Sequence, residues 1–171
     1  MAYVPPEPLG SDHWLDDFEC GEAALDDWLK RHALTAQASH SARVFVTFVD
    51  SDEEKAVAGY YALAAAQVAP SEATERALRG QPKTRPVPAI LLARLAVEIR
   101  HQEAGVGKSL LRDAMLRSLD AAENIGARVL LVHAKHEQAK RWYMKWDFEE
   151  SPSDPLHLMM LMKDLRAAAG R

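Results

Sequence analysis

A glycine-rich segment in the middle of the chain has the residue types that bind phosphate. It reads RHQEAGVGKSLL, from Arg100 to Leu111, and it lies between an apolar run and a helical pattern. Gly105 and Gly107 lack a Cβ atom, so a phosphate can approach the backbone there. The first N–H groups of a helix have no intrahelical partner and bind anions together with the helix dipole. We therefore expect the N–H groups of about Val106 to Ser109 to bind a phosphate, with Lys108 adding a charge at the rim.

The same segment ends in Gly-Lys-Ser, which is also how the ATP-binding P-loop ends. That loop requires Gly, four residues and then Gly-Lys-Ser/Thr, which would place its first glycine at position 102. Gln102 occupies this position. The sequence therefore favours a Gln-x-x-Gly-x-Gly phosphate site over a nucleotide-hydrolase loop. A glycine-rich helix start without any ligand remains the structural alternative for these six residues alone.

The elements that must position this loop alternate along the chain. Strands are predicted at Ala42–Asp50, Ala56–Val68, Ala89–Glu98, Ala127–Ala134 and Pro155–Leu165. Helices are predicted at about Gly21–Gln37, Ser71–Leu78, Val106–Asn124 and His136–Trp146. Ser71 is the expected N-cap of the second helix. We predict one mixed α/β domain over residues 1–171, with an extended segment at 1–12 and a frayed tail at 166–171.

Composition narrows the class of protein. The 171 residues carry a net charge of −4 and a single cysteine, Cys20, so no internal disulfide is possible. No apolar run is long enough to cross a bilayer, and the N-terminus lacks the pattern of a secretory signal. We therefore expect a cytoplasmic protein without a membrane partner, and we expect no metal. The mild negative charge excludes a uniformly basic surface but not a local basic face.

The order of motifs resembles the GNAT-fold N-acetyltransferases. The resemblance rests on LLARLAVE, RHQEAGVGKSLLRDAM, RVLLVHA and EQAKRWYMKWDF. It implies a central mixed, twisted β-sheet flanked by helices, with a bulged strand that splays from its neighbour and leaves a gap for acetyl-CoA. Backbone groups of the bulged strand would bind the pantetheine arm, and the loop would bind the phosphates. The implied residues are Leu95, Ala96 and Val97 for the arm, and Gln102, Glu103, Ala104, Gly105, Val106, Gly107, Lys108 and Ser109 for the phosphates.

A closer resemblance is to the GNAT toxins of type II toxin–antitoxin modules. It is carried by DFECGEAALDDWLKRHALTAQASHSARVFVTF, RPVPAILLARLAV and DPLHLMMLMKDL. The resemblance implies acetylation of the α-amine of aminoacyl-tRNA, which blocks translation. It also implies a ribbon-helix-helix antitoxin as partner and a homodimer. The alternatives are a GNAT enzyme that acetylates a small amine or a protein N-terminus, and a non-catalytic module that binds CoA or the antitoxin.

Acetyl transfer requires a neutral amine, a polarised thioester carbonyl and a proton for the departing thiolate. Tyr143 is the predicted acid, because the ordinary pKa of tyrosine, about 10, is close to that of an alkyl thiol. Tyr143 and Phe148 also match the Tyr-x-x-x-x-Phe spacing of the family. Core packing with a bonded hydroxyl is the alternative role for Tyr143. The backbone N–H near Val97 is the expected carbonyl polariser, and no side chain stands out as a general base.

Binding of RNA would require basic residues near the cleft. The candidates are Lys30, Arg31, Arg79, Arg85 and Arg94. Arg94 stands out, because it interrupts an apolar strand and should be paired or functional there. For any one of the others, a solvated surface charge is the alternative. Two residues depart from the family pattern: Asp147 and Glu103 stand where glycine is common, and Glu103 would place a negative charge near the diphosphate.

Overall fold

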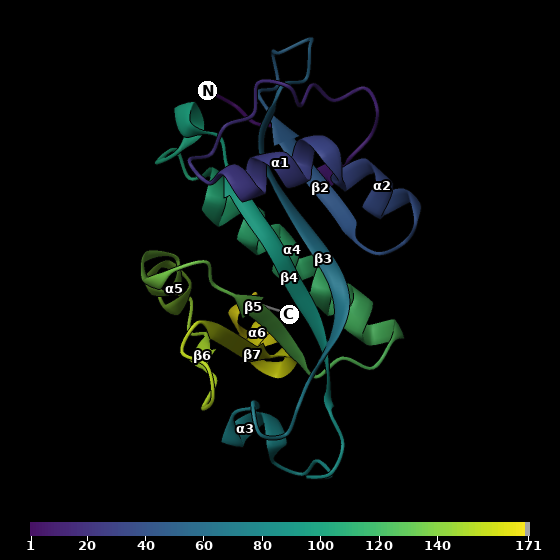
Figure 1. Ribbon diagram of the computed structural model, residues 1–171, viewed down its shortest axis with the longest axis vertical. Helices are drawn as coiled ribbons and strands as arrows, with labels where there is room; N and C mark the ends of the chain where they lie inside the picture. Colours follow the sequence, from purple (N-terminus) through teal and green to yellow (C-terminus); the bar gives the residue numbers. More distant parts are fainter. Residues whose placement is uncertain (170–171) are drawn as a thin grey trace. The chain divides into compact units, whose positions relative to one another are not determined.

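Helices and strands alternate through the computed structural model, which describes residues 1–169 (Figure 1). The strands are β1 (Glu7–Pro8), β2 (Arg43–Phe48), β3 (Val57–Val68), β4 (Val87–Val97), β5 (Val129–His133), β6 (Glu149–Glu150) and β7 (His157–Leu161). The helices are α1 (Ala23–Arg31), α2 (Ala33–Ala38), α3 (Glu75–Leu78), the 3₁₀ turn η1 (Ile99–His101), α4 (Val106–Asn124), α5 (Glu137–Met144) and α6 (Met162–Ala168). The predicted mixed α/β class is confirmed.

These elements form two compact units. The first contains residues 1–64 and 93–114, and the second contains residues 65–92 and those from 115 onward. Strands β3 and β4 and helix α4 each contribute residues to both units. The organisation of residues 1–171 as one domain stays a prediction.

The strands of the described residues are hydrogen-bonded in the order β1-β2-β3-β4-β5-β7-β6. In the first unit, β2 pairs antiparallel with β1 and with β3, and Tyr60 lies opposite Val46. In the second unit, β4 pairs parallel with β5 from Ala89 opposite Val129 to Leu92 opposite Val132. Strand β7 is antiparallel to both β5 and β6. The sheet is therefore mixed, as predicted.

The core of the first unit lies between α1 and the strands. Leu25 and Leu29 of α1 pack in one buried cluster with residues of β2 and β3 that include Val46 and Tyr60. Helix α4 also lies close to β3. A Cβ atom added at Gly59 would lie 2.9 Å from Leu110 Cδ1 and 3.1 Å from Val106 Cγ1, both in α4. Glycine at position 59 therefore allows the first two turns of α4 to pack directly on β3.

The core of the second unit joins α3 to one face of β4, β5 and β7. Ala77 of α3 packs in a buried cluster with residues that include Ala89, Leu131 and Met159. Arg128, just before β5, holds the end of α3, because its guanidinium donates hydrogen bonds to the carbonyl oxygens of Ala77 (2.6 Å), Arg79 (3.1 Å) and Arg76 (3.2 Å). These contacts satisfy carbonyl groups that the end of a helix leaves without partners.

Two predicted helices differ from the observed ones. The helix predicted at Gly21–Gln37 is divided into α1 and α2 at His32, whose φ of −124° lies outside the helical range. The helix predicted from Ser71 begins only at Glu75. Its N-cap is Thr74, whose hydroxyl accepts a hydrogen bond from the N–H of Ala77 (3.2 Å). Residues 72 and 73 instead donate to the carbonyl of Ala69, so they form a separate turn.

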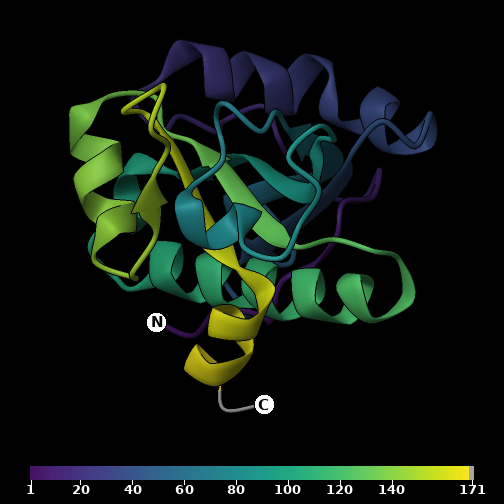
Figure 2. The same cartoon turned by 90° about the horizontal axis from the view of Figure 1, so that it is seen from below.

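The last predicted strand, Pro155–Leu165, is also wrong in its second half. Strand β7 ends at Leu161, and α6 follows at once, as Figure 2 shows in yellow. Met162 and Leu165 are both buried at a spacing of three residues, which suits a helix face. Residues 166–168 belong to α6, residues 170–171 lie outside the described part, and the fraying of the tail stays a prediction.

The N-terminal segment pairs with β2, which was not predicted, and an extended conformation over residues 1–12 stays a prediction. Strand β1 pairs with β2, and Tyr3 forms an isolated bridge with Val49. Within residues 1–169, no helix is both long enough and apolar enough to cross a membrane.

Candidate functional site

The glycine-rich loop joins η1 to α4 through two residues with positive φ, Glu103 (65°) and Gly105 (83°). The first intrahelical hydrogen bond of α4 runs from the N–H of Ser109 to the carbonyl of Gly105 (3.1 Å). The N–H groups of Val106 and Gly107 come before this bond, so they are placed to meet an anion. The expectation that the N–H of Ser109 binds a phosphate is wrong, because this N–H donates its hydrogen bond to the N-cap carbonyl of Gly105.

Gln102 connects this loop to two other segments. Its side-chain Nε2 donates to the carbonyl oxygens of Val97 (2.9 Å) and Cys20 (3.0 Å). Its backbone N–H donates to Ile99 (3.3 Å). The remaining polar atoms of Gln102 are acceptors, which do not bind a phosphate. We therefore assign Gln102 a role in positioning the loop, in place of the expected phosphate contact.

The end of β4 is fixed from several directions. Ala96 is buried, whereas Leu95 and Val97 are partly exposed. The backbone N–H of Glu98, just beyond Val97, donates to Ala58 of β3 (2.8 Å). The carboxylate of Glu98 is buried, accepts the backbone N–H of Arg100 (3.0 Å) and pairs with the guanidinium of the same residue (3.2 Å). These contacts give Glu98 a structural role and leave it unsuited to act as a general base.

Arg94 lies on the indole of Trp28. Its guanidinium carbon is 4.1 Å from the ring centroid, and the indole in turn stacks on Tyr60. Within the described residues no carboxylate pairs with Arg94. Burial lowers the pKa of Arg94, although the guanidinium stays charged at neutral pH. The prediction that an arginine in this strand needs a partner is met by an aromatic ring instead of an anion.

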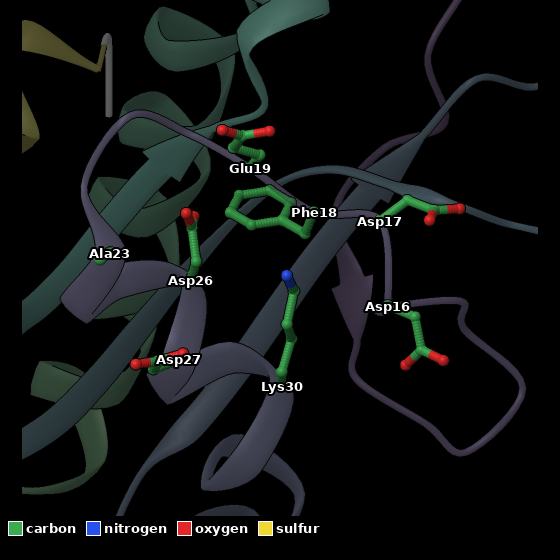
Figure 3. Close-up of a pocket in the computed structure, with 8 residues that line it drawn as sticks. All are labelled: Asp16, Asp17, Phe18, Glu19, Ala23, Asp26, Asp27 and Lys30. Carbon is green, nitrogen blue, oxygen red and sulfur yellow. The ribbon is translucent and has the colours of Figure 1, made fainter.

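Lys30 and Arg31 lie side by side at the end of α1, and both are exposed. Lys30 lines a pocket of about 460 Å³ together with the carboxylates of Asp16, Asp17, Glu19, Asp26 and Asp27. Figure 3 shows the amine of Lys30 directed toward Phe18, with the acidic side chains around it. Acidic groups repel RNA phosphates, so the geometry favours Lys30 as a counter-charge within the pocket over a contact with RNA.

The second unit holds Arg79 and Arg85 in the exposed segment between α3 and β4. The neighbouring Arg76 is not available to RNA in the same way, because its guanidinium pairs with Glu149 (2.5 Å) and Asp164 (2.8 Å). Within residues 1–169, no three histidine, cysteine, aspartate or glutamate side chains are arranged to hold a metal ion.

Tyr143 lies near the end of α5. Its ring is buried and contacts Trp142 (centroids 5.0 Å apart) and Phe148 (5.8 Å apart) edge to face. No hydrogen bond to its hydroxyl is found within residues 1–169, which argues against the alternative of a bonded core tyrosine. Burial raises the pKa of Tyr143 above its ordinary value. The phenol is therefore fully protonated at neutral pH, but it is a weaker acid than the unperturbed value suggests.

Almost the whole chain can be aligned with a curated relative. The chain is 46% identical over 169 residues to a tRNA-acetylating toxin of Mycobacterium tuberculosis (strain ATCC 25618 / H37Rv), covering 99% of this chain and 98% of the relative. The chain belongs to the GNAT tRNA-acetylating toxins. No family model matches the chain.

Solved structures of GNAT toxins confirm the fold. The toxin AtaT in complex with acetyl-methionyl-tRNAfMet superposes with a TM-score of 0.87 at 24% identity, covering 97% of this chain and 98% of AtaT. A tyrosine-to-phenylalanine mutant of AtaT, bound to the C-terminus of the antitoxin AtaR and to acetyl-CoA, superposes with a TM-score of 0.83 at 23% identity, covering 99% of both chains.

Both residues that depart from the expected family pattern have positive φ angles. Glu103 (65°) and Asp147 (68°) have the left-handed backbone that glycine adopts most easily. Aspartate tolerates this conformation better than glutamate does.

Sequence reasoning missed two residues of the site. The contact of Trp28 with the guanidinium of Arg94 was not predicted. The carbonyl of Cys20 as an acceptor for Gln102 was missed as well. The charge of Arg94 within an apolar strand is a signal that some partner, here Trp28, must be present. No local pattern reveals the acceptor of Gln102, because Cys20 lies 82 residues away in the sequence.

Proposed function

We propose that this GNAT toxin transfers the acetyl group of acetyl-CoA to the α-amine of aminoacyl-tRNA and so blocks translation. The observation that carries the proposal is the 46% identity to a tRNA-acetylating toxin over 99% of the chain. The exposed loop at the start of α4, with N–H groups of Val106 and Gly107 ahead of the first helical hydrogen bond, supports the binding of a phosphorylated co-substrate.

Acetyl-CoA would use two segments of the first unit. The backbone of Leu95, Ala96 and Val97 would hold the pantetheine arm, and residues Glu103 to Ser109 would hold the diphosphate. The carbonyl of Val97 accepts a hydrogen bond from Gln102, and a backbone N–H of this strand would polarise the thioester carbonyl. Lys108 is exposed and adds a positive charge at the rim.

Tyr143 would protonate the CoA thiolate as it leaves. Its raised pKa keeps the proton on the hydroxyl before the reaction. The attacking amine of an aminoacyl ester has a lower pKa than a lysine amine, so it can reach its neutral form without a dedicated base. Two candidate bases near the loop already have partners, which agrees with a reaction that needs no dedicated base. Glu98 pairs with Arg100, and Nδ1 of His101 is hydrogen-bonded to the hydroxyl of Tyr3 (2.8 Å).

The basic residues Arg31, Arg79, Arg85 and Arg94 would contact phosphates of the RNA. The acidic pocket around Lys30 makes Lys30 the least favoured member of the predicted set. We further propose a ribbon-helix-helix antitoxin as the partner, a homodimer as the assembly and the cytoplasm as the location. The antitoxin bound to AtaT supports a partner of the antitoxin class.

A transfer assay with labelled acetyl-CoA and bulk charged tRNA tests the proposal. We expect label in N-acetyl amino acids released from the tRNA by alkali. Label only in small amines or protein N-termini would replace the tRNA substrate with the first alternative. Binding of acetyl-CoA without any transfer would favour the non-catalytic module and overturn the proposal.

A further inference from the structure

Arg94 stands on a column of planar side chains in the first unit. Its guanidinium lies 4.1 Å from the centroid of Trp28, and Trp28 stacks on Tyr60 with an interplanar angle of 13° and centroids 6.1 Å apart. Tyr60 is fully buried, so the column has a rigid base. The three residues come from β4, α1 and β3.

Tyr60 is held by a hydrogen bond and by an aromatic contact. Its hydroxyl donates to the carbonyl of Leu25 in α1 (2.7 Å), and its ring meets Phe18 edge to face at 5.5 Å. Because Leu25 is in the same helix as Trp28, this hydrogen bond also sets the height of α1 above β3. The position of the indole is therefore determined by packing, and the indole in turn limits where Arg94 can lie.

The guanidinium keeps unused binding capacity. Within the described residues it has no ion pair and no hydrogen bond, yet it is partly buried. The guanidinium carbon lies over the indole ring, and arginine commonly stacks on aromatic faces. In that arrangement its five N–H donors, which lie in the plane of the group, form the fork that suits the oxygens of a phosphate.

We propose that Trp28 is a positioning residue that holds the Arg94 guanidinium as a fixed fork for a phosphate at the 3′ end of the acceptor RNA. The inference rests on the proposed function and adds to it a residue that itself contacts no RNA. Arg94 directly precedes Leu95–Val97, the segment expected to hold acetyl-CoA. A phosphate held by Arg94 would bring the end of the RNA next to that segment.

CoA also carries phosphates, so the two sources must be separated. The CoA diphosphate already has the N–H groups at the start of α4, which follow Arg94 by more than ten residues. We therefore assign the Arg94 fork to RNA. On this assignment, disturbing the column changes the KM for charged tRNA and leaves the KM for acetyl-CoA within about twofold of the wild type.

Steady-state acetylation of charged tRNA tests this with four single variants and the double variant of Trp28→Leu with Arg94→Gln. Trp28→Leu removes the aromatic support, Trp28→Phe keeps it, and Arg94→Gln removes the charge. Trp14→Leu is the matched control, because Trp14 is an exposed tryptophan of the same unit. We expect Trp28→Leu and Arg94→Gln each to raise the KM for tRNA about tenfold, and Trp28→Phe to raise it less than about threefold. The double variant should be no worse than Arg94→Gln alone.

Salt dependence supplies a readout that misfolding would not imitate. Loss of one phosphate contact should flatten the slope of log binding constant against log salt by about 0.7 to 0.9 for Arg94→Gln. Fluorescence anisotropy with uncharged tRNA measures this slope without any turnover. Circular dichroism and thermal unfolding check that each variant is folded.

Three results would overturn the inference. They are an unchanged KM for tRNA in Arg94→Gln, equal rises in the KM values for tRNA and acetyl-CoA in Trp28→Leu, and a KM for tRNA in Trp28→Phe as high as in Trp28→Leu. A wild-type enzyme that does not acetylate charged tRNA would instead contradict the proposed function. In that case the anisotropy measurement still decides whether Arg94 and Trp28 act together on a phosphate.

Discussion

The side-chain amide of Gln102 donates a hydrogen bond to the backbone carbonyl of Cys20, with 3.0 Å between the two atoms. The same nitrogen also donates to Val97 at the end of β4. The segment before α1, the end of β4 and the glycine-rich loop therefore meet at one amide group. A residue expected to bind phosphate instead joins the three segments that would surround the co-substrate.

Gln102→Ala should weaken acetyl-CoA binding although it removes no direct contact. It leaves two carbonyl groups without donors and frees the loop, so we expect the Kd for acetyl-CoA to rise about five- to tenfold. Isothermal titration calorimetry measures the change. Gln138→Ala, an exposed glutamine of α5, is the matched control and should bind as the wild type does. Equal affinity in Gln102→Ala and Gln138→Ala would refute the positioning role.

Tyr143→Phe should abolish most turnover and leave acetyl-CoA affinity within about twofold. The phenyl ring keeps its contacts with Trp142 and Phe148, and only the hydroxyl is lost. A general acid contributes about 10²- to 10⁴-fold to the rate, so kcat should fall by that range. Single-turnover transfer from labelled acetyl-CoA, with calorimetry for binding, separates the two effects. A variant with normal kcat would show that Tyr143 only packs the core.

The free energy of unfolding should fall at alkaline pH, because three buried groups have raised pKa values. Burial, helped by a hydrogen bond with Asp26, raises the pKa of Cys20 to about 12, and burial also raises the pKa values of Tyr60 and Tyr143. A folded pKa above the unfolded value gives stability that is complete below the unfolded pKa and is lost as the pH rises through the folded one. Urea unfolding should therefore show stability falling from about pH 9 upward, and a flat profile to pH 12 would contradict this.

The same pKa shift predicts a poorly reactive thiol. At pH 8 the thiolate fraction of Cys20 should be roughly a thousandfold below that of an ordinary cysteine. Labelling of the folded protein by a disulfide reagent should be correspondingly slow and should become fast in denaturant. Fast labelling of the native state would contradict the environment seen for Cys20.

The sequence predicted the elements with strong periodicity and the class of the fold. Helix α4 has the predicted bounds, Val106–Asn124, because an apolar face and a glycine-rich start agree there. The errors occur where two local signals compete, as with Ser71 and Thr74 for the cap of α3. Residue types and the family resemblance pointed to the loop, Arg94 and Tyr143 as candidates, and their roles stay predictions. Their partners come from distant segments through packing, so the roles of Trp28 and Gln102 required the structure.

Glu103→Gly should stabilise the protein and tighten acetyl-CoA binding. Glutamate at φ 65° is strained, and relief of that strain should exceed the greater entropy of glycine by about 0.5 kcal/mol. The change also removes a negative charge beside the expected diphosphate. Asp147→Gly provides the control, because Asp147 has a similar φ of 68° but lies outside the loop. It should alter thermal stability alone, and tighter binding in both variants would contradict the charge argument.

Gly59→Ala should displace α4 and so impair the loop. The added methyl group would lie 2.9 Å from Leu110, 3.1 Å from Val106 and 3.2 Å from the carbonyl of Ala96. Overpacking of this kind costs about 1–3 kcal/mol. Gly126→Ala, where an added Cβ meets nothing within 4 Å, is the matched control and should unfold at the wild-type temperature. Equal melting temperatures for both variants would show that β3 and α4 adjust without cost.

The N-terminal segment contacts both β2 and the 3₁₀ turn η1, which directly precedes the glycine-rich loop. The hydroxyl of Tyr3 is hydrogen-bonded to Nδ1 of His101, and β1 lies on β2 a few residues later. A protease that cut once after Pro8 would release Tyr3 and β1 together while leaving the buried cluster beneath α1 mostly intact. In an activity assay, such a cleaved protein would behave as if its binding of acetyl-CoA were impaired. On a gel, the loss of eight residues would be only a small change in size. Trimming at this end therefore has to be checked by mass before any loss of activity is assigned to the loop.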